Sequence, residues 1–323
     1  IITILQNDIE SFRTDTGSKP LSSDDKTVLQ RSISEFKSDN SDYISEKRRI
    51  EKLINNLENL DSNSLKNEVK RIQDLIKNFK TNNLDLSFTS KDISDLNSLL
   101  NQHVSTYFIK HIQSLNSIIK NSRTPNSLQY KVLGLKQELN NFHGSNRLSL
   151  YPNDIIYDSD YSGLLSEIEN LQNNIIDRSE YLAKVKSFEG KIDGYKSTSL
   201  NDHEHITGHI QMLMRQIDTF KTTKKQTKIS DTDKFKLKNR LSNNLKDNFK
   251  NKINSFTDIS QFTDIEKLIN SLKPSKYLTL QDFSYLQGLI IDKKQDIIEY
   301  QQMKQRLDQR ISYLTLGDSD LLS

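Results

Sequence analysis

The sequence predicts an all-α protein made of tandem helical-bundle repeats that share long helices and together form an elongated rod. Glycine and proline, which interrupt helices, number only 9 and 4 among 323 residues. Apolar residues recur at the spacing of one helical face, and the same spacing returns in several separate segments. Hydrophobic residues make up only 33% of the chain, which favours slim bundles over one large core.

Three segments share one long pattern and are expected to form long amphipathic helices. Each begins with Asp-x-x-x-Leu-x-x-x-Ile and continues to a tyrosine, after which apolar residues follow on the same helical stripe. The most complete copy predicts a single helix over residues 160–195. The starting aspartates and the tyrosines of the three copies are Asp25 and Tyr43, Asp160 and Tyr181, and Asp282 and Tyr300.

A second long element lies between copies of the first and recurs at an offset of 141 residues. Its apolar positions run from Leu96 to Ile118 and again from Leu237 to Ile259. Both runs predict another long helix with one buried stripe. The positions of the two elements that we expect to be fully buried are Ile54, Phe108, Ile192 and Phe249.

Shorter helices are predicted between the long ones. Residues 62–80 and 203–222 carry matching apolar positions, and a third short pattern begins at Leu5, Leu135 and Ile265. The long helices start at a hydroxyl residue that is followed three residues later by an aspartate, which is a helix N-cap pattern. These aspartates are therefore interpreted as helix starts before catalytic groups. The pairs are Ser22 and Asp25, Thr89 and Asp92, Ser230 and Asp233, and Thr279 and Asp282.

Period and order together give a super-repeat of about 130 residues. Residues 1–24 are expected to end a preceding repeat, residues 25–159 and 160–281 to form two super-repeats, and residues 282–323 to start a third. The chain is thus expected to be part of a longer one. Each long helix would close one three-helix bundle with its first half and open the next with its second half. Separate four-helix bundles, one for each 130-residue repeat, remain the alternative arrangement.

This plan resembles spectrin-type rods of tandem three-helix bundles. It is closest to the repeats of giant staphylococcal surface proteins that bind the extracellular matrix. The resemblance covers the architecture along the whole chain and carries no sequence motif. It implies a repetitive, elongated structural protein, and it favours the cell surface or extracellular space over the cytoplasmic cytoskeleton.

Candidate chemistry in the sequence is sparse. His205 and His209 have the i, i+4 spacing that places two imidazoles on one helix face, and His203 lies beside them. The order of residues in HEHITGH differs from the zinc motif HExxH, so we expect solvated histidines and no metal site. His103 and His111 are weaker candidates still. Cysteine is absent, which excludes thiol catalysis and cysteine-based zinc sites.

A basic run could attract nucleic acid or another anionic surface. Aromatic residues are not interleaved with it, because Phe220 and Phe235 are assigned to the apolar stripes, so a solvated surface is expected. Lys47-Arg48-Arg49 is a smaller cluster of the same kind. The basic residues of the main run are Lys221, Lys224, Lys225, Lys228, Lys234, Lys236, Lys238 and Arg240.

No enzyme motif, cofactor loop or membrane-spanning apolar run is found in the sequence. The repeated tyrosines are interpreted as packing residues with wet hydroxyl groups. The predicted function is a structural rod or spacer segment that displays or tethers other domains, with no catalytic, cofactor or metal site. The alternative is a helical protein-binding module, such as an adhesin or a cytoskeletal adaptor. In either case we expect protein partners along the helical faces, no specific nucleic acid and no membrane insertion.

Overall fold

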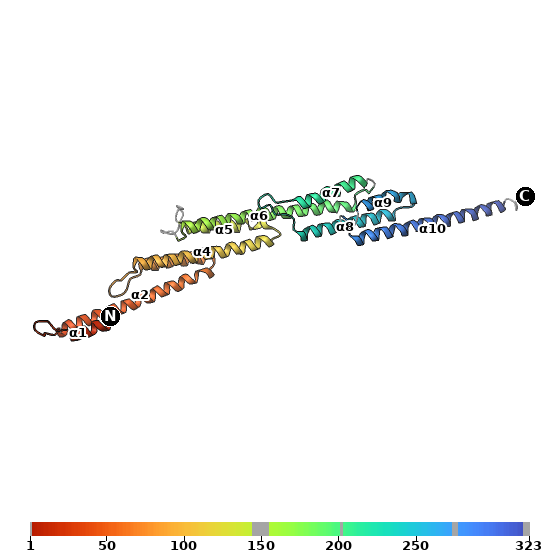
Figure 1. The fold of residues 1–323 in the computed structure, drawn as a ribbon. Coiled ribbons are helices and arrows are strands. Elements are labelled where there is room, and N and C mark those ends of the chain that lie inside the picture. The colour runs from red at the N-terminus through yellow and green to blue at the C-terminus, as the bar shows by residue number, and fades with distance from the viewer. Residues whose placement is uncertain (1, 144–154, 201–202, 273–276, 319–323) are drawn as a thin grey trace. The chain divides into compact units, whose positions relative to one another are not determined.

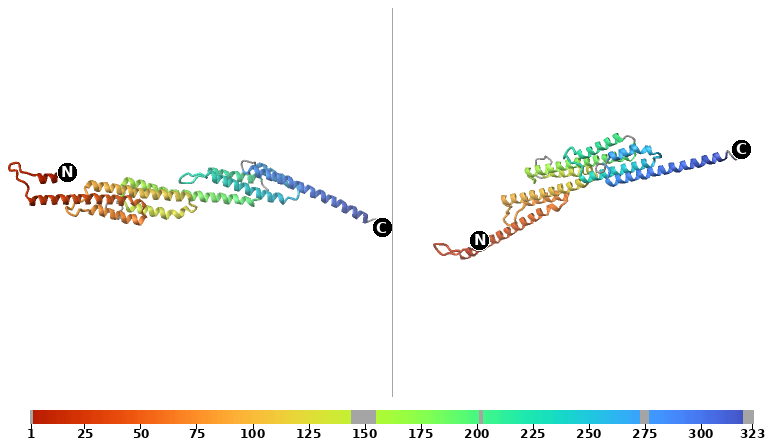
Figure 2. Two further views of the ribbon diagram at one scale, coloured as in Figure 1. Left: turned by 90° about the horizontal axis from the view of Figure 1, so that it is seen from below. Right: turned by 45° about the vertical axis from the view of Figure 1, so that its right-hand side comes forward.

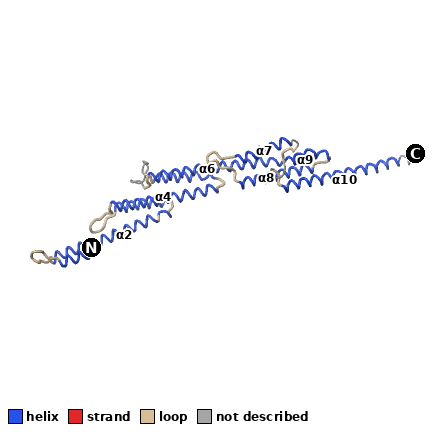
Figure 3. Tube along the Cα trace, viewed as in Figure 1, coloured by secondary structure: helices blue, strands red, loops and turns tan. Residues whose placement is uncertain are grey.

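The computed structural model describes residues 2–143, 155–200, 203–272 and 277–318. Helices, short 3-10 helices included, account for 81% of the described residues, and these residues contain no β-strand (Figure 3). Isolated antiparallel bridges pair Arg13 with Pro20 and Lys221 with Lys228. The predicted all-α fold class is therefore confirmed.

The chain divides into two compact units, Ile1–Ile175 and Ile176–Ser323. In unit 1, α2 and α4 lie side by side, and α3 packs against both (Figure 1). Short 3-10 helices at Leu57–Asn59 and Pro125–Leu128 follow α2 and α4. The α-helices that lie wholly in unit 1 are α1 (Ile2–Ser11), α2 (Ser23–Asn55), α3 (Ser62–Asn78), α4 (Ser90–Asn121) and α5 (Gln129–Asn141).

Unit 2 contains the end of α6 and four further α-helices. In this unit α8 packs against both α9 and α10, and α7 contacts α9. Further 3-10 helices lie at Gly194–Lys196 and Ile259–Gln261. The α-helices of unit 2 that follow α6 are α7 (His203–Thr219), α8 (Asp231–Asn254), α9 (Phe262–Ser271) and α10 (Leu280–Asp318).

The long helix α6 (Asp158–Asp193) contributes to the cores of both units. Ile168 and Ile175 in its first half belong to the core of unit 1, whereas Phe188 and Ile192 in its second half belong to the core of unit 2. Because the boundary between the units falls inside a continuous helix, the predicted long helix over 160–195 is confirmed.

The expected apolar stripes are buried where other helices cover them. Ile54 of α2, Phe108 of α4, Ile192 of α6 and Phe249 of α8 are each fully buried, as predicted. Removing a buried phenylalanine side chain costs about 3–5 kcal/mol, so Phe108 and Phe249 contribute strongly to the cores of the two units.

Two outer segments expose the same kind of stripe. Leu29 and Phe36 in the first half of α2 are 40% and 47% exposed. Leu307 and Ile311 in the second half of α10 are 48% and 58% exposed, although the pattern matches that of Phe188 and Ile192. Both views in Figure 2 show the end of α10 extending beyond the other helices of unit 2.

The second long element differs from its predicted extent at its ends. Helix α8 stops at Asn254, and Ile259 starts a 3-10 helix because Asp258 caps that helix and Gln261 completes a capping box. In α4 the predicted Ile118 is 44% exposed, and its neighbour Ile119 is buried instead. The apolar stripe therefore shifts by one residue at the end of α4.

Candidate functional site

The most specific geometry in the molecule lies where each long helix begins. At four of these junctions a serine or threonine hydroxyl accepts a hydrogen bond from the backbone N–H of the aspartate three residues later. Each cap satisfies a backbone donor that the helix leaves unpaired. The interpretation of Asp25, Asp92, Asp233 and Asp282 as helix starts is confirmed.

A tyrosine on the preceding long helix completes two of these caps. The hydroxyl of Tyr43 in α2 donates to the Asp92 carboxylate and accepts from the N–H of Thr89 at 3.1 Å. Tyr181 in α6 makes the same pair of contacts, donating to Asp233 at 2.5 Å and accepting from the N–H of Ser230 at 3.1 Å. The prediction that these phenols are wet is wrong, since both are bonded to the next helix start.

Asn101 of α4 binds the start of α6 in the way that Tyr43 and Tyr181 bind the starts of α4 and α8. Its side-chain oxygen accepts from the N–H of Tyr157 at 3.0 Å, and its amide donates to Asp160 at 2.8 Å. Because it is buried at 7% exposure, its polar groups need these partners.

Ser242 of α8 does the same at the start of α10. Its hydroxyl accepts from the N–H of Thr279 at 3.0 Å and donates to Asp282 at 2.7 Å. Neither Ser242 nor Asn101 was selected from the sequence. The sequence did offer one signal. Each is a polar residue directly after one of two leucines, Leu100 and Leu241, that align with each other at the offset of 141 residues.

An aspartate one helical turn before each bonded tyrosine holds the loop that leads to the cap. Asp39 is fully buried and accepts from the hydroxyl of Thr81 at 2.7 Å and from the backbone N–H groups of Asn83 and Leu84 at 3.2 and 2.6 Å. The hydrogen bonds from Thr81, Leu84 and Asn83 outweigh the effect of burial, so the pKa of Asp39 is lowered.

Asp177 occupies the equivalent position in α6. It accepts from the hydroxyls of Thr222 and Thr227, the latter at 2.7 Å, and from the N–H of Lys225 at 3.1 Å. Glu180, beside Tyr181, accepts from both the N–H and the hydroxyl of Thr223.

These residues define a pattern, Asp-x-x-Asp/Glu-Tyr, that we call the anchor motif. The repeated spacing identifies the tyrosines in the sequence, but it gave no reason to select the carboxylates. The three copies in the chain are Asp39/Asp42/Tyr43, Asp177/Glu180/Tyr181 and Asp296/Glu299/Tyr300.

The segments that the anchor motif binds are cap loops, which we define as residues 14–22, 81–89 and 222–230. In each cap loop the first threonine hydroxyl accepts from the N–H five residues later, at 3.1, 2.9 and 2.9 Å. The fifth residue of each has a positive φ, which is 48° at Ser18, 51° at Asp85 and 55° at Gln226. The three loops therefore share one conformation, although their sequences differ.

Lysines add charge to two caps. Lys47, one turn after Tyr43, is bonded to Asp92 and lowers the pKa of that carboxyl, with help from Tyr43 and Thr89. The same hydrogen bond raises the pKa of Lys47. Lys246 lies 3.0 Å from Asp282 in the equivalent arrangement at the start of α10.

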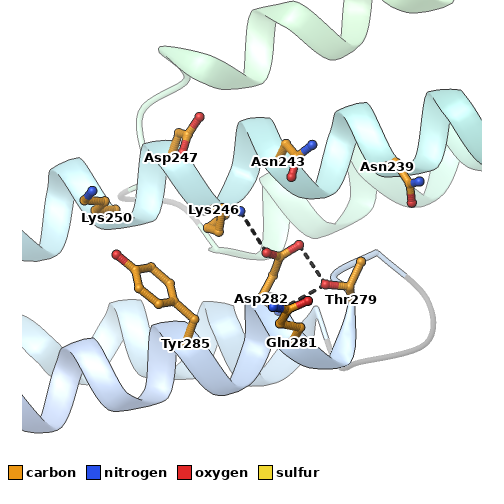
Figure 4. A pocket seen from close by; sticks show the side chains of 9 residues that line it. All are labelled: Asn239, Asn243, Lys246, Asp247, Lys250, Thr279, Gln281, Asp282 and Tyr285. Atoms are coloured by element: carbon orange, nitrogen blue, oxygen red, sulfur yellow. Dashed lines mark hydrogen bonds and ion pairs between the residues drawn. The ribbon is translucent and has the colours of Figure 1, made fainter.

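The cap of α10 borders an open groove between α8 and α10 (Figure 4). Burial raises the pKa of Asp282, but hydrogen bonds from Ser242, Thr279 and Lys246 outweigh it and lower that pKa. A carboxylate held ionised in this way has no proton to donate near neutral pH and is a weaker base than an ordinary aspartate, so the geometry favours a structural role. The lining residues are Asn239, Asn243, Lys246, Asp247, Lys250, Thr279, Gln281, Asp282 and Tyr285.

The histidine candidates lie at the surface or in structural contacts. The rings of His205 and His209 are exposed and 3.9 Å apart, and the side chain of His203 lies outside the described residues. His103 faces Glu58 at 2.9 Å, and His111 contacts the carbonyl oxygen of Tyr107 at 2.9 Å. Within the described ranges no three His, Asp or Glu side chains gather in a way that could hold a metal ion.

The basic run consists of an exposed loop and a helix whose charges are largely paired. Lys234 faces Asp218 at 3.5 Å, and Arg240 makes two hydrogen bonds to Asp193. Phe235 is 65% exposed, so its assignment to the buried stripe is wrong: the stripe of α8 begins two residues later, at Leu237. In the smaller cluster, Lys47 pairs with Asp92 and Arg49 with Glu46.

No known protein family, curated protein or solved structure matches the chain. In the described part of the chain, none of the helices has an apolar stretch long enough to cross a bilayer.

Proposed function

We propose that the chain is a structural spacer, a rod of tandem three-helix bundles that holds other parts of a protein assembly apart. The observation that carries this proposal is the continuity of α6, whose Ile168 and Ile192 lie in two different cores. A helix that is shared by two bundles fixes the orientation of one bundle relative to the next and transmits tension between them.

The repeated junctions support the same role. Tyr43, Asn101, Tyr181 and Ser242 each bind the start of the next long helix, so consecutive helices are joined by side chains as well as by loops. An enzyme needs one singular reactive site, whereas these contacts recur along the chain and serve helix ends.

Small-angle scattering of the 323-residue chain tests the proposed rod. A rod of shared helices, which rise about 1.5 Å per residue, would be on the order of 130–180 Å long and have a radius of gyration of roughly 40–50 Å. If the same 323 residues formed one compact body, its radius of gyration would be about 20 Å. A value near 20 Å would eliminate the spacer proposal, and an intermediate value would favour folded-back four-helix units.

Asn174→Pro provides a variant that acts on the shared helix alone. Asn174 lies inside α6 and donates to Asn116 of α4 at 2.9 Å. Proline would remove a backbone hydrogen bond and break the helix, so the radius of gyration should change while most helicity remains. Asn174→Ala is the matched control, because it removes the same side-chain contact and keeps the helix intact.

The alternative function is a helical protein-binding module. Saturable binding of the isolated chain to an extracellular-matrix protein or a cytoskeletal filament, lost on mutation of one repeat only, would favour this module over a spacer.

A further inference from the structure

A second groove in unit 2 is lined mainly by apolar side chains. It lies between the first turns of α8 and the segment that leads into α10, shares two lining residues with the groove of Figure 4, and has a volume of about 510 Å³. Phe235 and Leu280 border it and are 65% and 70% exposed, whereas Tyr277 and Leu278 are buried. Grooves of this size can hold a small ligand or a partner's side chain. We call it the apolar groove.

The equivalent junction of unit 1 is built without the two exposed apolar side chains. The hydrogen bonds that join α4 to the start of α6 correspond to those that join α8 to the start of α10, and they align the two junctions. Phe235 then corresponds to Ser94, at the offset of 141 residues. Leu280 corresponds to Asp158, since each lies two residues before the aspartate of its junction. Both counterparts are polar and exposed, so the junction does not need apolar residues at these positions.

The charge of the same segment also differs between the two units. Residues 221–250 contain ten lysines and arginines against three aspartates, a net charge of +7, although the whole chain carries only +3. The equivalent residues 80–109 contain two lysines and three aspartates, a net charge of −1. Both segments form a cap loop of the same conformation followed by a long helix, so the fold does not require the added positive charge.

Three of the added lysines lie in the cap loop that precedes α8. Lys224, Lys225 and Lys228 are exposed, and in the described part of the chain none of them forms an ion pair. Their counterparts in the cap loop of residues 81–89 are uncharged. Lys228 precedes the N-cap of α8 by two residues, and Phe235 follows that cap by five. Positive charge and exposed apolar surface therefore occur together at the start of α8.

We propose that this surface docks an acidic segment of a partner protein. A bulky apolar side chain of the segment enters the apolar groove between Phe235 and Leu280, and carboxylates beside it pair with the lysines of the cap loop. An apolar centre with a charged rim of complementary sign is the usual arrangement of a protein-binding surface. A nucleic acid or an anionic bilayer could use the lysines, but neither accounts for the groove, because phosphates and sugars are polar and a bilayer surface is too flat to enter it.

Docking of an acidic segment goes beyond the spacer role and does not depend on it. The probe is a short fluorescein-labelled peptide with the repeating sequence Asp-Leu-Glu, and fluorescence anisotropy with the full chain measures its binding. Saturable binding with a Kd on the order of 100 μM or tighter is expected. A peptide with the repeating sequence Asp-Ser-Glu has the same charge without the leucines, and it should bind at least about tenfold more weakly.

Replacing the apolar side chains by polar ones tests the groove. Phe235→Ser combined with Leu280→Ser makes both positions polar, as they are in unit 1, and should weaken binding of the leucine peptide by at least about tenfold. Ile291→Ser is the matched control, because Ile291 lies on α10, is 66% exposed and does not line the groove. Circular dichroism should show that both variants remain helical.

The charges of the cap loop are tested in the same way. Lys224→Asn combined with Lys228→Ser introduces the residues that unit 1 has at these positions, and it should weaken binding several-fold and reduce its dependence on salt. Lys120→Asn combined with Lys131→Asn removes two exposed charges from unit 1 and should leave binding unchanged.

No saturable binding of the leucine peptide up to on the order of 1 mM would overturn the proposal. Equal binding of the two peptides, or an unchanged affinity in the groove variant, would also overturn it. Oligothymidylate and phosphatidylserine vesicles serve as unlabelled competitors and should compete poorly. Direct binding of either that is tighter than that of the peptide and is lost only in the lysine variant would replace the acidic segment by a phosphate-bearing partner. None of these results changes the radius of gyration expected for the chain, so the spacer proposal is tested separately.

Discussion

The phenol of Tyr181 donates a 2.5 Å hydrogen bond to a carboxylate oxygen of Asp233, 52 residues further along the chain. The same phenol accepts from the backbone N–H of Ser230, which caps α8, the helix that carries Asp233 in its first turn. One side chain thus serves both members of a helix cap. Its donation to Asp233 also lowers the pKa of that carboxyl.

Replacing Tyr181 by phenylalanine should therefore destabilise unit 2 while leaving the packing of the ring in place. The N–H of Ser230 and the carboxylate of Asp233 would each lose a partner, so we expect a loss of about 1–2 kcal/mol in the free energy of unfolding. Urea denaturation, monitored by circular dichroism, measures this loss in the free energy of unfolding. Tyr285→Phe, in the same unit and 44% exposed, should change the free energy by less than about 0.5 kcal/mol. Equal effects of the two variants would show that the phenol contributes nothing.

The buried carboxylate of Asp39 should control the order of the cap loop. Its replacement by alanine leaves the hydroxyl of Thr81 and the N–H groups of Asn83 and Leu84 without their acceptor. We expect the amide hydrogens of Asn83 and Leu84 to exchange at least about tenfold faster, as measured by NMR. Asp24→Asn, at an exposed position, is the control. Unchanged exchange at both amides would contradict this role of Asp39.

The core of unit 2 should depend on Phe249. Its side chain is fully buried in α8, and Phe249→Ala should lower the free energy of unfolding by about 3–5 kcal/mol. Phe235→Ala removes the same side chain from the same helix at a position that is 65% exposed, and it should cost less than about 1 kcal/mol. Thermal or urea unfolding of the pair would test the assigned helix register, which a similar cost at both sites would refute.

Acid should weaken the contact between α6 and α8. Two hydrogen bonds from the Arg240 guanidinium, at 2.8 and 2.6 Å, hold the pKa of Asp193 down to about 2, against 3.8 for the free side chain. Because the folded pKa is below the unfolded one, the unfolded chain binds more protons as the pH falls. The stability from this pair is thus complete above about pH 4 and is lost as the pH approaches about 2.

Asp193→Asn tests this pH dependence. The difference in urea stability between the wild-type chain and this variant should be present at pH 6 and shrink steadily below pH 4. Asp264→Asn is the control, because the Asp264 carboxylate is 73% exposed and lies 4.0 Å from Lys267. A difference that stays constant from pH 6 to pH 2 would exclude a contribution from ionised Asp193.

Helical periodicity predicted the fold class and most of the core, because each helix buries one apolar stripe and the spacing of the apolar residues can be read directly from the sequence. Ile54 and Phe249 are examples. Capping chemistry is equally local, so Thr89 and Asp92 could be identified from a spacing of three residues. The four-residue spacing between Asp39 and Tyr43 is also local, but its meaning depends on a loop more than 40 residues away.

Polar contacts across helices could not be derived in this way. Asn101 and Ser242 are ordinary helix residues until the next helix start is placed beside them. The exposure of Leu307 likewise could not be predicted, because a stripe indicates what a helix can bury but not whether another helix is there to cover it.

The short reach of the junction contacts has a consequence for how the chain folds. The hydrogen bonds that bind Asp282 and Asp160 to the preceding long helix span only 40 and 59 residues of a 323-residue chain. Because the entropy lost on closing a loop grows with the length of chain between the two contacting residues, these contacts cost less to form than contacts between the two ends of the chain would. Each helix start finds its partner among residues that the ribosome has already released. Further helices added after α10 would therefore not slow the folding of the helices that precede them.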